Sequence, residues 1–115
     1  MNWIELKSES QLTEIIERSQ SKPQVIFKHS TRCSISSMAK SRLERSTTPD
    51  NVDFYYLDLI AHRNISNKIA AEFEVYHESP QVLVVKNGEC VYSESHSSIN
   101  MAEIEEQTTN STVMN

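Results

Sequence analysis

The sequence predicts one α/β domain, a three-layer α/β/α sandwich around a central mixed sheet of four strands, or of five if residues 3–6 add an edge strand. Expected helices and strands alternate along most of the 115-residue chain, which is typical of parallel strands joined by crossover helices. The dipeptide Asn87-Gly88 then separates two strand-like segments, and both of its positions suit the positive φ of a tight hairpin. The last two strands are therefore expected to be antiparallel.

The first expected helix covers residues 10–20, because its apolar residues fall at helical spacing and Ser10 precedes them as a cap. Pro23 breaks this pattern. The short apolar run over residues 24–27 then predicts a buried strand.

A second helix is expected after residue 33, because four residues recur at helical offsets as one apolar stripe. The members of that stripe are Ile35, Met38, Ala39 and Leu43. Residues 47–51, with Pro49 among them, end this helix, and the aromatic and β-branched residues over 52–59 predict the next strand.

The third helix is marked by apolar residues at helical spacing, namely Ile65, Ile69 and Phe73. Residues 81–86 and 89–93 form the expected hairpin strands. A last helix starts near Asn100. We assign residues 1–106 to the single domain and expect the polar residues 107–115 to form a frayed tail.

Composition and charge exclude several classes of protein. The chain has 11 Lys and Arg against 16 Asp and Glu, a net charge of −5, which argues against nucleic acid as a partner. No apolar run is long enough to span a membrane. Residues 1–10 lack the apolar stretch of a signal peptide, so we expect a cytoplasmic protein. Gly88 is the one glycine, which excludes glycine-rich phosphate loops.

The two cysteines differ in their settings. Cys33 lies between the end of the first central strand and the start of the second helix, and its sequence neighbours are polar. A helix N-terminus favours the thiolate, which is the reactive form of cysteine, so we expect Cys33 to be a nucleophile. Cys90 lies between Glu89 and Val91 in a hairpin strand and is interpreted as a packing residue. The alternative is that Cys90 resolves a disulfide with Cys33.

Two cysteines are too few for a four-thiolate metal site, and we expect no metal.

Positive charge is concentrated in the segment around Cys33. Residues 28–45 carry a net charge of +4, and the remaining residues carry −9. The cations of this segment are Lys28, Arg32, Lys40, Arg42 and Arg45. Lys28 and Arg32 are the better candidates for stabilising a thiolate, while Arg42 and Arg45 suit an ordinary solvated helix face. His29 is a further candidate, either to stabilise the thiolate or to protonate a leaving thiol.

Ser36 stands three residues after Cys33, where a dithiol oxidoreductase has its second cysteine. A serine cannot resolve a mixed disulfide, so the chemistry must use one thiol of the chain together with an external thiol. Ser36 and Ser37 could also donate hydrogen bonds to the sulfur or cap the helix, and Ser34 adds an amide and a hydroxyl near the sulfur. Ser79 and Pro80 precede the first hairpin strand, where a cis peptide opposite the thiol would expose the Ser79 backbone to a substrate.

Two strings resemble the YtxJ-type monothiol bacilliredoxins, a thioredoxin-like family of the bacillithiol system. They are Lys-His-Ser-Thr-Arg-Cys-Ser-Ile-Ser over residues 28–36 and His-Glu-Ser-Pro-Gln-Val over residues 77–82. The likeness extends over about residues 11–104. One departure is that the family's Thr-Cys-Pro-Ile-Ser reads Arg-Cys-Ser-Ile-Ser here, so Ser34 replaces a proline that is pre-organised for a helix start.

The resemblance implies an enzyme that removes bacillithiol from S-bacillithiolated proteins. It implies that Cys33 is the nucleophile and that Ser79 and Pro80 wall the substrate groove, with His77 and Thr31 as further substrate contacts. The implied partners are S-thiolated client proteins and a low-molecular-weight thiol. Bacillithiol would be a co-substrate, with no bound cofactor, and we expect a monomer.

Two other functions remain open from the sequence. Monothiol glutaredoxins have a similar arrangement and hold iron–sulfur clusters, although their Cys-Gly-Phe-Ser signature is absent here. The second alternative is a redox-inert thioredoxin-like adaptor or thiol sensor.

Overall fold

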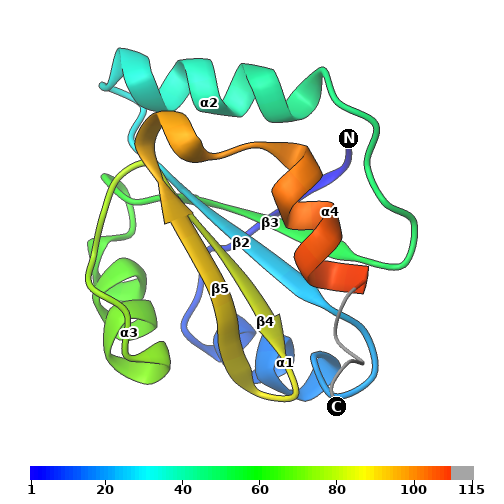
Figure 1. The fold of residues 1–115 in the computed structure, drawn as a ribbon. Coiled ribbons are helices and arrows are strands. Elements are labelled where there is room, and N and C mark those ends of the chain that lie inside the picture. Colours follow the sequence, from blue (N-terminus) through cyan, green and yellow to red (C-terminus); the bar gives the residue numbers. More distant parts are fainter. Residues whose placement is uncertain (110–115) are drawn as a thin grey trace.

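A five-stranded mixed sheet forms the centre of the structure, a computed structural model that describes residues 1–109 (Figure 1). The strands are β1 (Trp3–Glu5), β2 (Gln24–His29), β3 (Asp53–Asp58), β4 (Gln81–Lys86) and β5 (Glu89–Ser95). Their order is β1-β3-β2-β4-β5, in which β1, β3 and β2 are parallel while β4 and β5 are antiparallel to their neighbours. The expected mixed sheet and final hairpin are confirmed, and the edge strand at the N-terminus is present.

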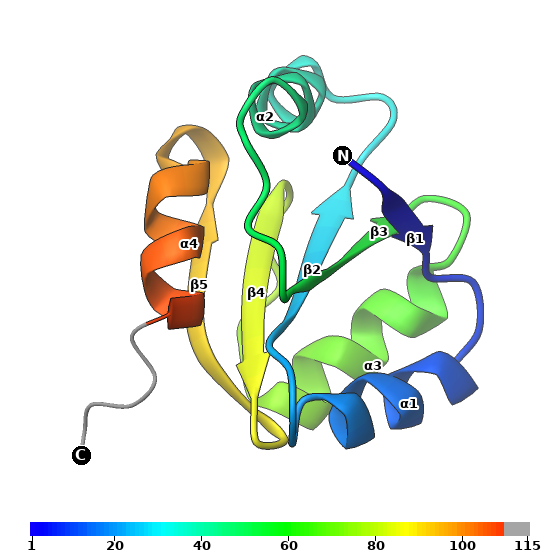
Figure 2. The ribbon, with the colours of Figure 1, turned by 90° about the vertical axis from the view of Figure 1, so that its right-hand side faces the viewer.

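Helices cover both faces of this sheet (Figures 1 and 2). They are α1 (Ser10–Arg18), α2 (Ser34–Glu44), α3 (Arg63–Phe73), the short 3₁₀ helix η1 (His96–Ser98) and α4 (Met101–Thr109). The core divides into two clusters, one beneath α1 and α3 and the other beneath α2 and α4. Ser10 is the first helical residue of α1 rather than its cap, since Glu9 occupies the N-cap position.

The two central strands, β2 and β4, are buried along their whole length. Successive side chains of a strand point to opposite faces. Val25 and Phe27 therefore pack beneath α2 and α4, whereas Ile26 packs beneath α1 and α3. The same alternation separates Lys28 from His29, because His29 stacks on Phe27 with ring centroids 5.8 Å apart.

The apolar stripe expected on α2 is only half correct. Ala39 and Leu43 are buried against the sheet, but the side chains of Ile35 and Met38 are 51% and 64% exposed. Ser36 takes the buried position in the first turn instead. A polar residue therefore faces the sheet at the start of α2, next to the end of β2.

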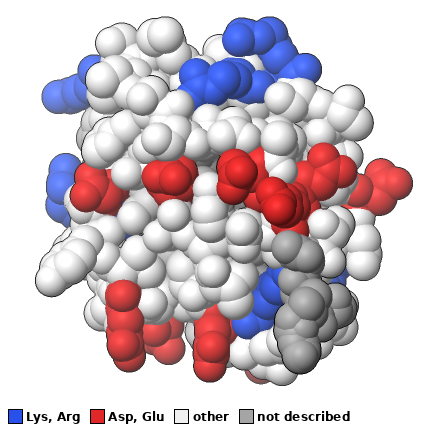
Figure 3. All heavy atoms as spheres, in the orientation of Figure 1, with Lys and Arg blue, Asp and Glu red and all other residues white. Residues whose placement is uncertain are grey.

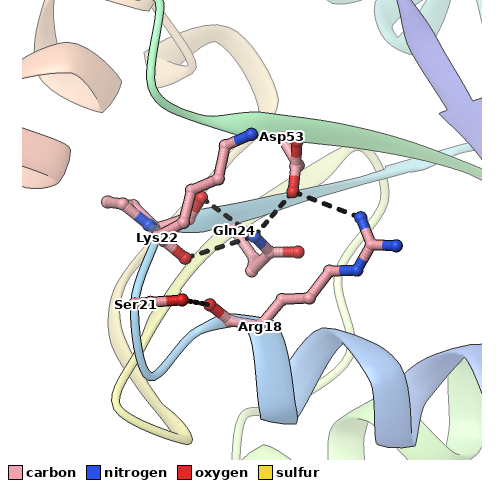
Figure 4. A network of polar contacts seen from close by, with 6 residues as sticks. Arg18, Ser21, Lys22, Gln24 and Asp53 are labelled. Carbon is pink, nitrogen blue, oxygen red and sulfur yellow. Dashed lines mark hydrogen bonds and ion pairs between the residues drawn. The ribbon is translucent and has the colours of Figure 1, made fainter.

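A polar network joins the amino ends of β2 and β3 (Figure 4). Lys22 Nζ lies 2.9 Å from Asp53 Oδ1, and Gln24 Nε2 donates to Asp53 Oδ2 at 2.9 Å. Arg18 Nη1 is 3.8 Å from the same carboxylate. Burial alone raises the pKa of Asp53, but these hydrogen bonds and cations outweigh it and leave the pKa lowered.

The hairpin turn has the predicted conformation, with φ of 52° at Asn87 and 79° at Gly88. The Gly88 amide donates to Ser19 Oγ at 2.8 Å, so the turn rests on the end of α1.

The last helix, α4, continues past the expected domain end at residue 106 and reaches Thr109. Thr108 is buried, and Lys86 Nζ donates to the Gln107 carbonyl. Residues 110–115 of the expected tail lie outside the described residues.

Within the described chain, no helix combines the length and apolar character that a membrane crossing requires.

Candidate functional site

Cys33 is the N-cap residue of α2 and follows the carboxyl end of β2 by four residues. Its backbone is extended, with φ −112° and ψ 121°, and its carbonyl accepts from the Ser37 amide at 3.0 Å. The residue is half-buried, so the thiol is partly accessible. Thr31, Arg32 and Ser34 around it are exposed. The Cys33 side chain makes no cap hydrogen bond, but a helix N-terminus favours negative charge in its vicinity.

Ser36 joins the first turn of α2 to the end of β2. Its Oγ lies 2.6 Å from Nδ1 of His29 and accepts from the Ser30 amide at 3.0 Å. Ser36 is fully buried and His29 is nearly so. The Ser36 hydroxyl, which was expected to support the thiolate, thus forms hydrogen bonds with His29 and Ser30 in the segment that precedes Cys33.

The His29 ring packs against two aromatic side chains, and charged side chains lie nearby. It stacks on Phe27 and meets the Tyr56 ring edge-on at 5.5 Å, while Lys40 Nζ lies 5.2 Å from the Tyr56 centroid. Burial lowers the pKa of His29, Lys40 lowers it further, and Asp58 and Glu44 oppose this shift. A neutral imidazole is therefore favoured.

The loop that contains Ser79 and Pro80 runs beside the end of β2. Gln81 pairs in register with Lys28, which places Pro80 next to the strand end that leads to Cys33. The Ser79–Pro80 peptide bond is cis. The Pro80 carbonyl accepts from the His96 amide at 3.1 Å, and Gln81 Nε2 donates to the Tyr76 carbonyl at 3.0 Å.

Lys28 lies on the opposite face of the sheet from α2, beneath this loop. It is fully buried and its Nζ has no hydrogen-bond partner among residues 1–109. Its charge, together with that of Arg63, adds to burial in lowering the pKa of His77. His77 Nδ1 lies 3.3 Å from the buried Ser66 hydroxyl. The structure thus groups Lys28 with His77, while His29 and Ser36 lie on the other face.

The cations counted around Cys33 are dispersed in space. Lys40 pairs with Glu44 at 2.7 Å, and Arg42 donates to the Ile99 carbonyl from Nε and Nη2 at 3.2 and 3.0 Å. Figure 3 shows basic side chains gathered over α2 and an acidic belt across the middle of the same face. Arg32 is the exposed cation adjacent to the thiol in sequence.

Cys90 lies at the other end of the sheet. It pairs in register with Val85, which faces Gln24 at the start of β2, whereas Cys33 follows the end of that strand. Five residues of a strand span about 16 Å, and a disulfide requires Cα atoms within about 7 Å. Cys90 packs against the core beneath α1 and α3, and its thiol donates to the Tyr92 carbonyl at 3.3 Å. This geometry does not permit a Cys33–Cys90 bond.

Two residues next to the site, Ser66 and Arg63, were not predicted as site residues. Both come from α3 and lie near His77. No short-range spacing relates them to Cys33, because α3 follows β3 in the chain. Lys40, which was counted among the cations around Cys33, lies near His29. In the described chain, no three His, Cys, Asp or Glu side chains are grouped in a way that could hold a metal ion.

Solved structures with the same architecture identify the class of protein. A thioredoxin-fold protein proposed to be an oxidoreductase is 34% identical, with a TM-score of 0.76 and 90% of each chain covered. Thioredoxin from Malassezia sympodialis is 22% identical over 95% of this chain and 90% of its own, with a TM-score of 0.71. Thioredoxin from Schistosoma mansoni is 22% identical over 96% and 95%, with a TM-score of 0.67. The fold is that of thioredoxin-like oxidoreductases.

Within that class, the family is defined by the sequence. The family described as monothiol bacilliredoxin BrxC matches residues 4–104, which is nearly the whole chain. The chain therefore belongs to the monothiol bacilliredoxin family, as the strings around Cys33 and Pro80 predict.

Proposed function

We propose that the protein removes bacillithiol, or a similar low-molecular-weight thiol, from S-thiolated cytosolic proteins. The position of Cys33 carries this proposal, since this half-buried cysteine occupies the N-cap position of α2, just after the carboxyl end of a central strand. Family membership over residues 4–104 supports the same chemistry. The protein is then a thiol-disulfide oxidoreductase that uses a single cysteine.

The reaction is an exchange of disulfides. The Cys33 thiolate attacks the bacillithiol sulfur of the mixed disulfide, forming a Cys33–bacillithiol bond while the client–bacillithiol bond breaks. The client sulfur leaves as a thiolate and takes a proton from solvent. Ser36 cannot attack the new disulfide, so an external low-molecular-weight thiol must do so. That second exchange restores Cys33 and releases a disulfide between bacillithiol and the external thiol.

The surroundings of Cys33 supply contacts for such a substrate. In the proposed complex, the backbone at Ser79 and the wall formed by Pro80 border the bound disulfide, with Thr31 and His77 at its margins. Arg32 is exposed beside the thiol and suits the carboxylates of the bacillithiol malate. Ser34, in place of a proline, adds an amide and a hydroxyl at the helix start.

Mass spectrometry tests the proposal. The reduced protein is incubated with a bacillithiolated client protein, and both species are weighed with time. We expect the bacillithiol mass to move from the client to the peptide that contains Cys33. Cys33→Ser should accept nothing, whereas Cys90→Ser should behave like the wild type. A wild-type protein that stays unmodified while the client keeps its bacillithiol would contradict the proposal.

A further inference from the structure

The hydrogen bonds of Ser36 define the protonation of its neighbour His29. A serine hydroxyl has one hydrogen and two acceptor lone pairs. The Ser30 amide donates to one lone pair at 3.0 Å, so the remaining lone pair and the hydroxyl hydrogen face other groups. Nδ1 of His29, at 2.6 Å, is the acceptor that the described structure places within reach of that hydrogen. If the serine donates this hydrogen to Nδ1, that nitrogen carries no proton and the ring hydrogen is on Nε2.

The environment of His29 favours this neutral form. Its ring packs against Phe27 and Tyr56, and it is 5% exposed. The charged groups that face it are Lys40 and Glu44 from α2 and Asp58 from β3. Burial and Lys40 lower the pKa of His29 more than the two carboxylates raise it. A buried imidazolium at this position would also lose the hydrogen bond that Ser36 donates.

We propose that Ser36 is a positioning residue for Cys33: its hydroxyl donates to Nδ1 of a neutral His29 and accepts from Ser30, which fixes the first turn of α2 against the end of β2. The segment between these anchors is short and carries the thiol. The Cys33 amide donates to the Ser30 carbonyl at 3.1 Å, and the Cys33 carbonyl accepts from the Ser37 amide at 3.0 Å. The catalytic consequence rests on the proposed function, whereas the hydrogen-bond arrangement does not.

Protonation of His29 changes this arrangement. Nδ1 then becomes a donor toward Ser36, and the serine hydrogen loses its acceptor in a buried site. The first turn of α2 is held less firmly, and Cys33 reacts more slowly. The serine of the Cys-x-x-Ser motif therefore makes the reactivity of Cys33 depend on the charge of His29.

Nitrogen-15 NMR of the wild-type protein tests the arrangement directly. At neutral pH we expect the His29 ring to show an unprotonated Nδ1 and a protonated Nε2. A proton on Nδ1 at neutral pH would overturn the proposal. This measurement requires no variant, and it is independent of any thiol substrate.

Matched variants test the coupling to Cys33. Ser36→Ala should raise the His29 titration midpoint by roughly one pH unit, which is the shift produced by loss of one hydrogen bond. Ser37→Ala, an exposed neighbour on the same turn, should leave the midpoint unchanged, and Ser36→Thr, which keeps the hydroxyl, should restore it. An unchanged midpoint in Ser36→Ala would overturn the proposal.

The pH profile of Cys33 alkylation by iodoacetamide provides the second readout. We expect the wild type and Ser37→Ala to show an inflection at the His29 midpoint, and Ser36→Ala to lack it. An inflection that survives in Ser36→Ala would overturn the positioning role. Because alkylation requires no bacillithiol, this result is separate from the substrate named above, which the transfer of bacillithiol mass tests.

Discussion

At the scale of single residues, Lys28 places an ammonium group inside the protein core. The side chain is fully buried, and burial lowers the pKa of Lys28 from 10.5 to about 8. A buried charge without a partner is costly, because the desolvation of the ammonium is not offset. Lys28 therefore reduces stability at neutral pH, and its presence beneath the loop of Pro80 needs a functional reason.

Replacement of this lysine should stabilise the protein in a pH-dependent way. The unfolded chain keeps Lys28 protonated to higher pH than the folded chain, so the contribution of this group to stability rises between about pH 8 and pH 10.5. We expect Lys28→Met to be more stable than the wild type at pH 7 by up to about 3 kcal/mol, and this advantage to shrink above pH 8. Urea unfolding at several pH values measures the difference.

Lys68→Met is the matched control, because Lys68 is exposed on α3. Its stability difference from the wild type should be small and independent of pH over the same range. A Lys28→Met variant that is less stable than the wild type at pH 7 would show that the ammonium is compensated in the fold.

The two thiols should differ in their reaction with alkylating agents. Both cysteines are half-buried, but burial raises the pKa of the Cys90 thiol, whereas Cys33 lies at a helix N-terminus. We expect iodoacetamide at pH 7.5 to label Cys33 at least about tenfold faster than Cys90. Peptide mass spectrometry of the wild type, Cys33→Ser and Cys90→Ser gives both rates. Equal rates at the two cysteines would contradict this account.

Residue positions were predictable where they depend on chain neighbours and not where they depend on the sheet. Cys33 as a helix cap follows from the polar string around it. Lys28 and His29 are neighbours in sequence and were both expected to support the thiol, but strand alternation sends them to opposite faces. The grouping of Lys28 with His77 depends on strand register, which the sequence does not show.

At the scale of elements, Asp53 holds the starts of β2 and β3 together. The pKa of Asp53 is lowered in the fold, so its contribution to stability is present above the unfolded pKa and is lost as pH falls through the folded value. Arg18 and Lys22 are substantially exposed, which reduces the energy of these ion pairs. We expect Asp53→Asn to cost about 1 kcal/mol at pH 6 and almost nothing at pH 2, as measured by urea unfolding.

Asp50→Asn provides the comparison, since Asp50 is exposed in the loop before β3. Its effect should be small at both pH values. A loss in Asp53→Asn that is the same at pH 2 and pH 6 would indicate that packing, and not charge, accounts for the role of Asp53.

The α2 helix shows why element existence is easier to predict than element orientation. Apolar spacing correctly places a helix after Cys33, but it assigns Ile35 and Met38 to the buried face. The structure instead buries Ser36, whose hydroxyl forms hydrogen bonds with His29 and Ser30. Such a polar anchor has no signature in hydrophobic periodicity, because its partners belong to another element.

At the scale of the whole molecule, charge is distributed unevenly over the surface. The acidic belt in Figure 3 lies away from the basic side chains over α2. Residues 28–45 carry a net charge of +4. However, Lys28 is buried, Lys40 pairs with Glu44, and Arg42 donates to the Ile99 carbonyl. If the proposed function is correct, we expect the exposed Arg32 and the helix N-terminus to attract an anionic substrate to this end.

Arginine variants at the two ends of α2 test this attraction. Arg32 precedes Cys33, and Arg45 follows the other end of the 11-residue helix, about 16 Å away. We expect Arg32→Ala to slow attack on an anionic mixed disulfide by roughly two- to fivefold at low salt, and the difference to disappear near 1 M salt. Arg45→Ala should have little effect. Equal losses in the two variants would mean that general surface charge, and not local position, attracts the substrate.

The edge of the sheet at β5 has a consequence for the behaviour of the protein at high concentration. β5 carries Glu89 and Glu94, and its register with β4 is interrupted between Val84 and Val85. An interrupted edge that bears carboxylates is a poor template for a strand from another molecule, because pairing would bring like charges together along an irregular ladder. We therefore expect the β5 edge to resist strand pairing between copies of the protein at high concentration.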